Sequence, residues 1–362
     1  MNVYLANLAL FTVYALIIRS RGEYLFKYKT SHGAALFCSL AALHWIVISG
    51  LRHESIGSDT IGYRIDSYAV TVNESWSSLI QKFIDIYAGN LLGKDPGYSL
   101  FEKFTQVFFY DYQLYLVLIA VIFTVPMARW ICKYSADVYL SFLVYSVLFF
   151  AFFAITGLRQ TIVTAMAVFI GYRLILNRQL FLFIVVLLIA STIHKSALIF
   201  LPFYFICRFS VKRLHICILF LVLPILFVNR NSYSDFFKKL MGYEEYGINE
   251  AASTLNFTIM MVLIGLMVLW RLPTMIKRNW QAAHFINAYL MSMLLVPLTF
   301  VNPSAMRAVQ YYSIFIILLI PEIIKSFKGK DARIVYLAAV GLLFTLFIGA
   351  GSGGKYAFFW SI

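Results

Sequence analysis

Residues 112–128, YQLYLVLIAVIFTVPMA, form an uncharged and mostly apolar run. As a helix rising about 1.5 Å per residue, such a run is nearly long enough to cross the hydrocarbon core of a bilayer, which is about 30 Å thick. The rest of the chain is similar, since 62% of its 362 residues are hydrophobic, only 13% are charged, and the mean hydropathy is +0.81. A soluble domain carries about a quarter charged residues. The sequence therefore predicts an all-α polytopic membrane protein, with one integral membrane domain over residues 1–362.

Apolar runs bounded by charges or turn residues predict about twelve transmembrane or re-entrant helices. They lie at 2–18, 33–50, 112–128, 138–156, 160–176, 180–193, 196–207, 214–228, 255–270, 283–300, 308–324 and 334–350. The segments 180–193 and 196–207 are too short to cross a bilayer comfortably. They are either two spans or a re-entrant pair.

The net charge of +14 is explained by membrane topology. If the basic loop after the first span lies in the cytoplasm, the inner loops hold eighteen basic and four acidic residues, and the outer segments hold twelve of each. All of the net charge then lies on the inner side, as the positive-inside rule expects. We therefore expect both termini and the long hydrophilic segments 51–111 and 229–254 outside, and we expect no nucleic acid as a partner.

Several chemical signatures are absent from the sequence. Four cysteines lie in or beside apolar runs, at spacings typical of neither a metal site nor a disulfide framework. There is no nucleotide-binding loop, no HExxH motif, no GxSxG motif with triad spacing and no DxD pair. We expect neither a metal nor a cofactor.

The first outer segment predicts an amphipathic helix. Thr71 and Glu74 have the spacing of a capping box, and apolar residues then recur at helical spacing from Trp76 to Tyr87. Such a helix either lies on the bilayer surface or packs on the membrane bundle.

Aromatic residues follow in both outer segments. Asp95 and the following proline predict the start of a second helix, which carries Tyr98. Tyr243 and Tyr246 lie in the second segment. A tyrosine offers a flat apolar face and a hydroxyl, which suit a sugar ring, although aromatic residues at a membrane interface have the same pattern.

Three arginines stand at the outer ends of spans, Arg52, Arg159 and Arg307. The planar fork of guanidinium donors matches phosphate oxygens in a bidentate way, so three of them on one face could bind a pyrophosphate. The alternatives are contact with lipid headgroups and structural ion pairs. His194, between the two short segments, is a candidate base near neutral pH, or a structural histidine.

Five motifs in order resemble the EpsG-like branch of the bacterial Wzy-type polysaccharide polymerases. They are LRHESIGSDTIGYRIDSY, DPGYSLFEKF, GLRQTIVTAMAV, ASTIHKSALIFLP and NPSAMRAVQYYSIFIILLIP, over about residues 50–321. Ser58 stands where the family usually has threonine, and Asp95-Pro96 where it often has glutamate.

The resemblance implies an integral membrane glycosyltransferase of the GT-C-like class, in the inner membrane of a bacterium. It would transfer the growing glycan from undecaprenyl pyrophosphate to the non-reducing end of a new lipid-linked repeat unit at the periplasmic face. A flippase, a chain-length regulator and membrane lipid are the further expected partners. We assign roles as follows: pyrophosphate binding to Arg52, Arg159 and Arg307, the base to His194 or Asp59, and substrate positioning to Tyr63, Gln160, Asp95, Tyr98, Tyr243 and Tyr246.

Two alternatives remain open at this point. An O-antigen ligase uses the same donor, but it usually has a much larger outer loop late in the chain. A flippase for the same lipid should have two related halves and a polar path through the membrane. Neither feature is visible in the sequence.

Overall fold

A computed structural model describes residues 3–23, 25, 31–241, 254–349 and 355–361. The chain divides into two compact units, residues 1–198 with 338–362 and residues 199–337, and each is described by itself. The helix α19 (Gly329–Gly349) and the 3₁₀ helix η4 (Lys195–Phe200) run across the two boundaries. The prediction of a single membrane domain is not tested by this division.

The first unit contains eleven α-helices and three π-helical segments among its described residues. They are α1 (Val3–Ser20), α2 (His32–Gly50), α3 (Thr60–Gly62), η1 (Tyr63–Tyr68), α4 (Ala69–Asn73), α5 (Trp76–Ala88), α6 (Pro96–Gln106), α7 (Tyr112–Tyr134), α8 (Val138–Leu148), η2 (Ala151–Ile155), α9 (Leu158–Thr164), η3 (Ala165–Ile170), α10 (Gly171–Leu176) and α11 (Leu180–Ile193).

The second unit is also helical throughout its described part. Its elements are α12 (Phe203–Ile206), α13 (Arg213–Val228), α14 (Arg230–Met241), α15 (Leu255–Arg278), α16 (Ala282–Leu295), the 3₁₀ segments η5 (Val296–Phe300) and η6 (Pro303–Ala305), α17 (Met306–Ser313) and α18 (Ile316–Lys325).

The all-α polytopic fold is confirmed. Seven helices in the described part of the chain are long and apolar enough to cross a membrane, and two bent pairs raise the number to nine. The pairs α13–α14 and α17–α18, the latter counted from Pro303, bend by 88° and 51°. Three shorter apolar helices, Val138–Leu148, Leu180–Ile193 and Lys195–Ile206, account for the rest of the predicted segments. The count of about twelve is therefore not confirmed.

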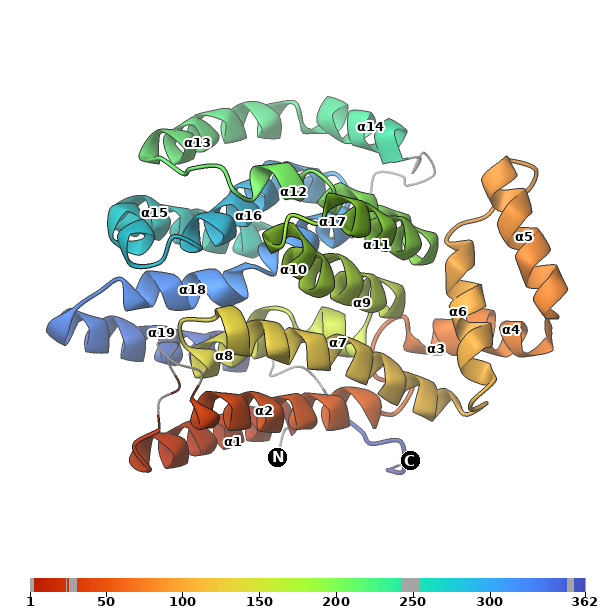
Figure 1. Ribbon diagram of the computed structural model, residues 1–362, viewed down its shortest axis with the longest axis horizontal. Coiled ribbons are helices and arrows are strands. Elements are labelled where there is room, and N and C mark those ends of the chain that lie inside the picture. The colour runs from red at the N-terminus through yellow and green to blue at the C-terminus, as the bar shows by residue number, and fades with distance from the viewer. Residues whose placement is uncertain (1–2, 24, 26–30, 242–253, 350–354, 362) are drawn as a thin grey trace. The chain divides into compact units, whose positions relative to one another are not determined.

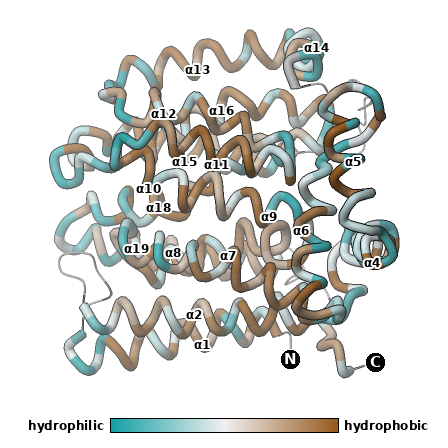
Figure 2. Tube along the Cα trace, turned by 45° about the vertical axis from the view of Figure 1, so that its right-hand side comes forward, coloured by the Kyte–Doolittle hydropathy of each residue, from teal (hydrophilic) through white to brown (hydrophobic). Residues whose placement is uncertain are grey.

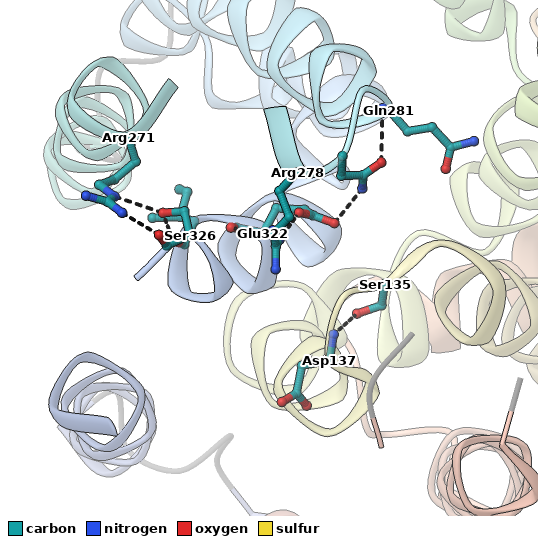
Figure 3. Close-up of polar contacts among 9 residues, drawn as sticks. Ser135, Asp137, Arg271, Arg278, Gln281, Glu322 and Ser326 are labelled. Atoms are coloured by element: carbon teal, nitrogen blue, oxygen red, sulfur yellow. Dashed lines mark hydrogen bonds and ion pairs between the residues drawn. The ribbon is translucent and has the colours of Figure 1, made fainter. Parts of the chain in front are cut away.

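Charged residues at helix ends have structural roles at the predicted inner side. Asp137 accepts a hydrogen bond from the Leu140 backbone N–H at the start of α8 and lies 3.6 Å from Arg19. In the second unit, the buried Glu322 forms an ion pair with Arg278 at the end of α15 (Figure 3). Burying a carboxylate requires such a partner.

The hydrophilic segment 51–111 folds at one end of the first unit. Elements α3 to α6 lie together where α2 ends and α7 begins (Figure 1). Figure 2 shows hydrophobic residues along α7 and more hydrophilic ones around α4. The helices α2 and α7 approach closely because Gly50 has no side chain, and a Cβ there would lie 2.9 Å from the Cα of Val117.

The amphipathic helix is confirmed, but its predicted capping box is wrong. Helix α5 begins at Ser75, whose hydroxyl accepts a hydrogen bond from the Ser78 backbone N–H. Thr71 instead belongs to the preceding helix α4 and donates to the Glu102 carboxylate. A serine directly before the apolar run satisfies the free N–H groups of the first turn better than a threonine four residues earlier.

Candidate active site

Asp95 lies at the centre of a polar cluster in the first unit. Its Oδ2 accepts a hydrogen bond from Nη1 of Arg159 at 2.9 Å, and Nδ1 of His194 lies 3.3 Å from the same oxygen. Its Oδ1 accepts a hydrogen bond of 3.1 Å from the backbone N–H of Lys195. One carboxylate therefore joins its own part of the chain to two others, around Arg159 and around His194.

The start of α6 directs Asp95 toward this cluster. The predicted helix start is confirmed, with Asp95 at the N-cap position and proline in the first turn. The Asp95 backbone, however, is left-handed, with φ of 54° and ψ of 49°, and its side chain makes no capping hydrogen bond. The carboxylate is thus free to bind groups outside its own helix.

Close packing of α6 on α11 brings Asp95 and His194 together. A Cβ on Gly97 would lie 2.1 Å from Oγ1 and 2.9 Å from the carbonyl carbon of Thr192. Only glycine allows the two helices to approach this closely. Because His194 is the C-cap of α11, this approach places its ring beside the first turn of α6.

Arg159 contacts two neighbouring tyrosine rings, whose centres are 5.7 Å apart. The carbon Cζ is 5.4 Å from the ring centre of Tyr63 and 5.7 Å from that of Tyr98, and Nε donates to the Tyr63 hydroxyl at 3.2 Å. Cation–π contacts and the hydrogen bond to Tyr63 restrict the positions that the guanidinium can take. Arg159 donates through Nε to Tyr63 and through Nη1 to Asp95, and its side chain is 31% exposed.

Asp95 is ionised near neutral pH in this arrangement. Its burial alone would raise the pKa of the carboxyl, but the His194 ring, the Arg159 guanidinium and the Lys195 N–H outweigh it and hold that pKa below its usual value. The Asp95 carboxylate faces Nδ1 of the His194 ring at 3.3 Å and so orients the ring. The ring's other nitrogen, Nε2, is then the atom that can exchange a proton with a substrate.

A family model described as the EpsG family matches residues 35–356. The chain belongs to the EpsG family. No curated protein and no solved structure matches it significantly. Membership implies a multi-pass membrane protein of exopolysaccharide biosynthesis.

Six of the residues predicted for the site of this EpsG-family protein lie in or behind the cluster, namely Tyr63, Asp95, Tyr98, Arg159, Gln160 and His194. Arg159 belongs to the first turn of α9 and follows Gly157, which is left-handed with φ of 66°. Gln160 is buried, and its Oε1 accepts a hydrogen bond of 3.3 Å from the hydroxyl of Ser196, which lies two residues after His194.

The structure places the other predicted residues elsewhere. Arg52 is only 1% exposed, and it donates to the carbonyl oxygens of Ser49 and Ile56, where α2 ends. This position is that of a structural arginine that satisfies free carbonyl groups at a helix C-terminus. Asp59 is the N-cap residue of α3, and its carboxylate accepts a hydrogen bond from Ser58.

Three predicted residues cannot be compared with the cluster. Arg307 lies half-buried in α17 of the second unit. Tyr243 and Tyr246 lie outside the described residues. Among the residues that the structure describes, no group of three or more His, Cys, Asp or Glu side chains could hold a metal ion.

Sequence reasoning missed Glu102, which is fully buried behind the cluster. Its Oε2 accepts hydrogen bonds from Ser67 at 2.7 Å and from Thr71 at 3.1 Å, and these join α6 to η1 and α4. The signal was present in the sequence, since Glu102 follows Tyr98 by four residues and so lies on the same face of the helix. A carboxylate on the inward face of an aromatic helix is a candidate for a buried polar contact.

Proposed function

We propose that this EpsG-family chain is a polysaccharide polymerase, a membrane glycosyltransferase that uses no nucleotide sugar. It transfers the growing glycan from undecaprenyl pyrophosphate to the non-reducing end of a new lipid-linked repeat unit, at the outer face of the bacterial inner membrane. The observation that supports this proposal is the Asp95–His194–Arg159 cluster, which combines an oriented histidine with a partly exposed arginine that contacts two tyrosine rings.

The reaction needs stabilisation of the leaving group. As the glycosidic bond from the donor sugar to the pyrophosphate breaks, the electron pair stays on the phosphate oxygen. A fixed cation that is already oriented stabilises this developing charge without reorganising. Arg159 fits the role because Tyr63, Tyr98 and Asp95 contact its guanidinium, while the side chain is 31% exposed.

The reaction also needs a base for the acceptor hydroxyl. As the hydroxyl oxygen bonds to the anomeric carbon, its proton passes to Nε2 of His194. Asp95 stabilises the resulting imidazolium through Nδ1, as the carboxylate does in a Ser-His-Asp triad. The location of the cluster agrees with a lipid-linked substrate, because Arg159 begins the candidate span Leu158–Leu176.

The experiment is a polymerisation assay on lipid-linked repeat units extracted from the producing strain, with purified protein in liposomes. We expect a glycan ladder from the wild type and none from Arg159→Ala. Arg159→Lys should restore only part of it, because a point charge does not reproduce the guanidinium fork. The matched control is Arg213→Ala, which removes an exposed arginine from α13 and should keep a normal ladder.

In cells, Arg159→Ala should leave single repeat units attached to the surface acceptor. Loss of the single repeats as well would point to a flippase or a ligase instead. A normal ladder from Arg159→Ala would contradict the assignment of this residue to the pyrophosphate.

A further inference from the structure

A cavity of about 510 Å³ lies in the first unit. Its walls come from the loop after α2, from η1 and α4, from the loop before α7 and its first turn, and from Phe359. Most ligand pockets for small molecules have volumes of roughly 300–1,000 Å³. The cavity therefore has room for a small oligosaccharide.

Four of the eleven residues that line the cavity are tyrosine or phenylalanine. Tyr68, Tyr110, Tyr112 and Phe359 contribute to the walls, and Tyr110 and Phe359 are 73% and 44% exposed. The hydroxyl groups of Tyr68 and Tyr112 donate to the carbonyl oxygens of Phe109 and Thr60, which fixes both rings. Fixed rings and exposed rings together offer the flat apolar surfaces on which the C–H faces of a sugar stack.

The charges of the lining fit hydroxyl groups better than phosphate. Arg64 is paired with Glu54, so its guanidinium is already neutralised, and Asp111 adds a second carboxylate. His53 contributes a ring whose Nδ1 contacts Ser55. The lining thus offers hydrogen-bond donors and acceptors without an excess of positive charge. A ligand with many hydroxyl groups binds to such a surface.

One short element joins this cavity to the catalytic cluster. Tyr63, the first residue of the π-helical η1, contacts Arg159, whereas its neighbour Arg64 and the last residue, Tyr68, line the cavity. Adjacent Cα atoms are about 3.8 Å apart. Segments of π-helix are frequent at functional sites. A ligand in the cavity therefore lies close to the residues that contact Arg159.

We propose that this cavity binds the sugars of the acceptor repeat unit, and that η1 separates them from the pyrophosphate bound at Arg159. The assignment rests on the proposed polymerase function and adds the acceptor subsite to it. The acceptor's terminal hydroxyl would then reach past η1 toward Nε2 of His194, while the sugars behind it are held by the aromatic walls.

The test is a binding measurement with the oligosaccharide released by mild acid from the strain's own lipid-linked repeat units. Titration calorimetry with the full chain in nanodiscs gives the dissociation constant. Tyr110→Ala should weaken binding about tenfold or more, as loss of an aromatic anchor does. The matched control is Phe108→Ala, which removes an equally exposed ring outside the cavity and should change nothing.

Arg159→Ala should also leave this binding unchanged, because the released oligosaccharide carries no pyrophosphate. Wild-type protein that does not bind the oligosaccharide would overturn the acceptor subsite. So would equal binding by wild type and Tyr110→Ala, or a loss of binding confined to Arg159→Ala. The first two of these outcomes can occur in a wild-type protein that still makes a ladder.

The proposed function fails in a different way. Suppose that the wild type makes no ladder from lipid-linked repeats but binds the oligosaccharide, and that Tyr110→Ala weakens this binding. This result would refute the polymerase function and support the saccharide site. In an active polymerase, Tyr110→Ala should raise KM for the lipid-linked acceptor with a smaller change in kcat.

Discussion

Glu102 should make the stability of the protein depend on pH, and replacement by glutamine should remove that dependence. Burial raises the pKa of this carboxyl to about 7 from 4.5, against the hydrogen bonds from Ser67 and Thr71, which lower it. The folded state therefore retains a proton that the unfolded chain releases as pH rises from about 4.5 to about 7. Stability from this group is greatest at low pH and is lost as pH rises through the folded-state value.

The size of the effect follows from the shift. At about 1.36 kcal/mol per pKa unit, the raised value corresponds to a loss of about 3 kcal/mol by pH 8, most of it between pH 5 and pH 8. Glutamine keeps an oxygen that accepts from Ser67 and Thr71, but it has no charge to bury. Relative to wild type, Glu102→Gln should thus gain stability as pH rises.

The assay is thermal unfolding in detergent at pH 5 and pH 8, at one fixed scan rate because such transitions are commonly irreversible. The difference in Tm between variant and wild type should grow by several degrees from pH 5 to pH 8. The effects of other titrating groups on Tm cancel in this difference, because both proteins contain the same groups. Glu74→Gln, which changes a more exposed carboxylate paired with Lys82, is the control and should show no such growth. A constant difference, or one that shrinks with pH, would refute the reasoning.

Three further predictions concern the site and the topology. His194→Gln should lower turnover at least about a hundredfold, the usual contribution of a general base, with little change in Tm; near-normal turnover would move the base role to another residue. Gly97→Ala should destabilise the protein by about 1–3 kcal/mol through overpacking against α11 and reduce activity, whereas Gly341→Ala, which meets no atom within 4 Å, should do neither. A single cysteine at Ser58 should react with an impermeant thiol reagent in intact spheroplasts, and labelling only after lysis would reverse the orientation.

Residue types and spacing were enough to predict the helical membrane fold and most members of the cluster. The start of α6 at Asp95 follows from local chemistry, since aspartate and proline suit an N-cap and a first turn. The contacts of Asp95 do not follow from it. They join α6 to α9 and to the end of α11, and such long-range contacts depend on how the helices pack.

Arg52 shows why a residue type alone is not sufficient. An arginine at the end of an apolar span is attracted equally by a phosphate and by the free carbonyl groups of its own helix, and the sequence pattern is the same in both cases. The structure shows the second arrangement. Arg159 differs because it stands at the start of a helix, where free N–H groups offer a guanidinium nothing to bind.

The left-handed backbone of Asp95 has a consequence for laboratory evolution. Glycine adopts this conformation without steric penalty, whereas an L-residue there costs roughly 1 kcal/mol, somewhat less for aspartate and asparagine. Asp95→Gly would relax the backbone, but it would also leave the Arg159 guanidinium and the Lys195 N–H without their acceptor, which costs more than the relaxation returns. The same substitution would remove the group that holds Arg159 and His194 together. A selection for heat resistance alone is therefore expected to retain Asp95 despite its left-handed backbone, because losing this residue lowers stability and activity together.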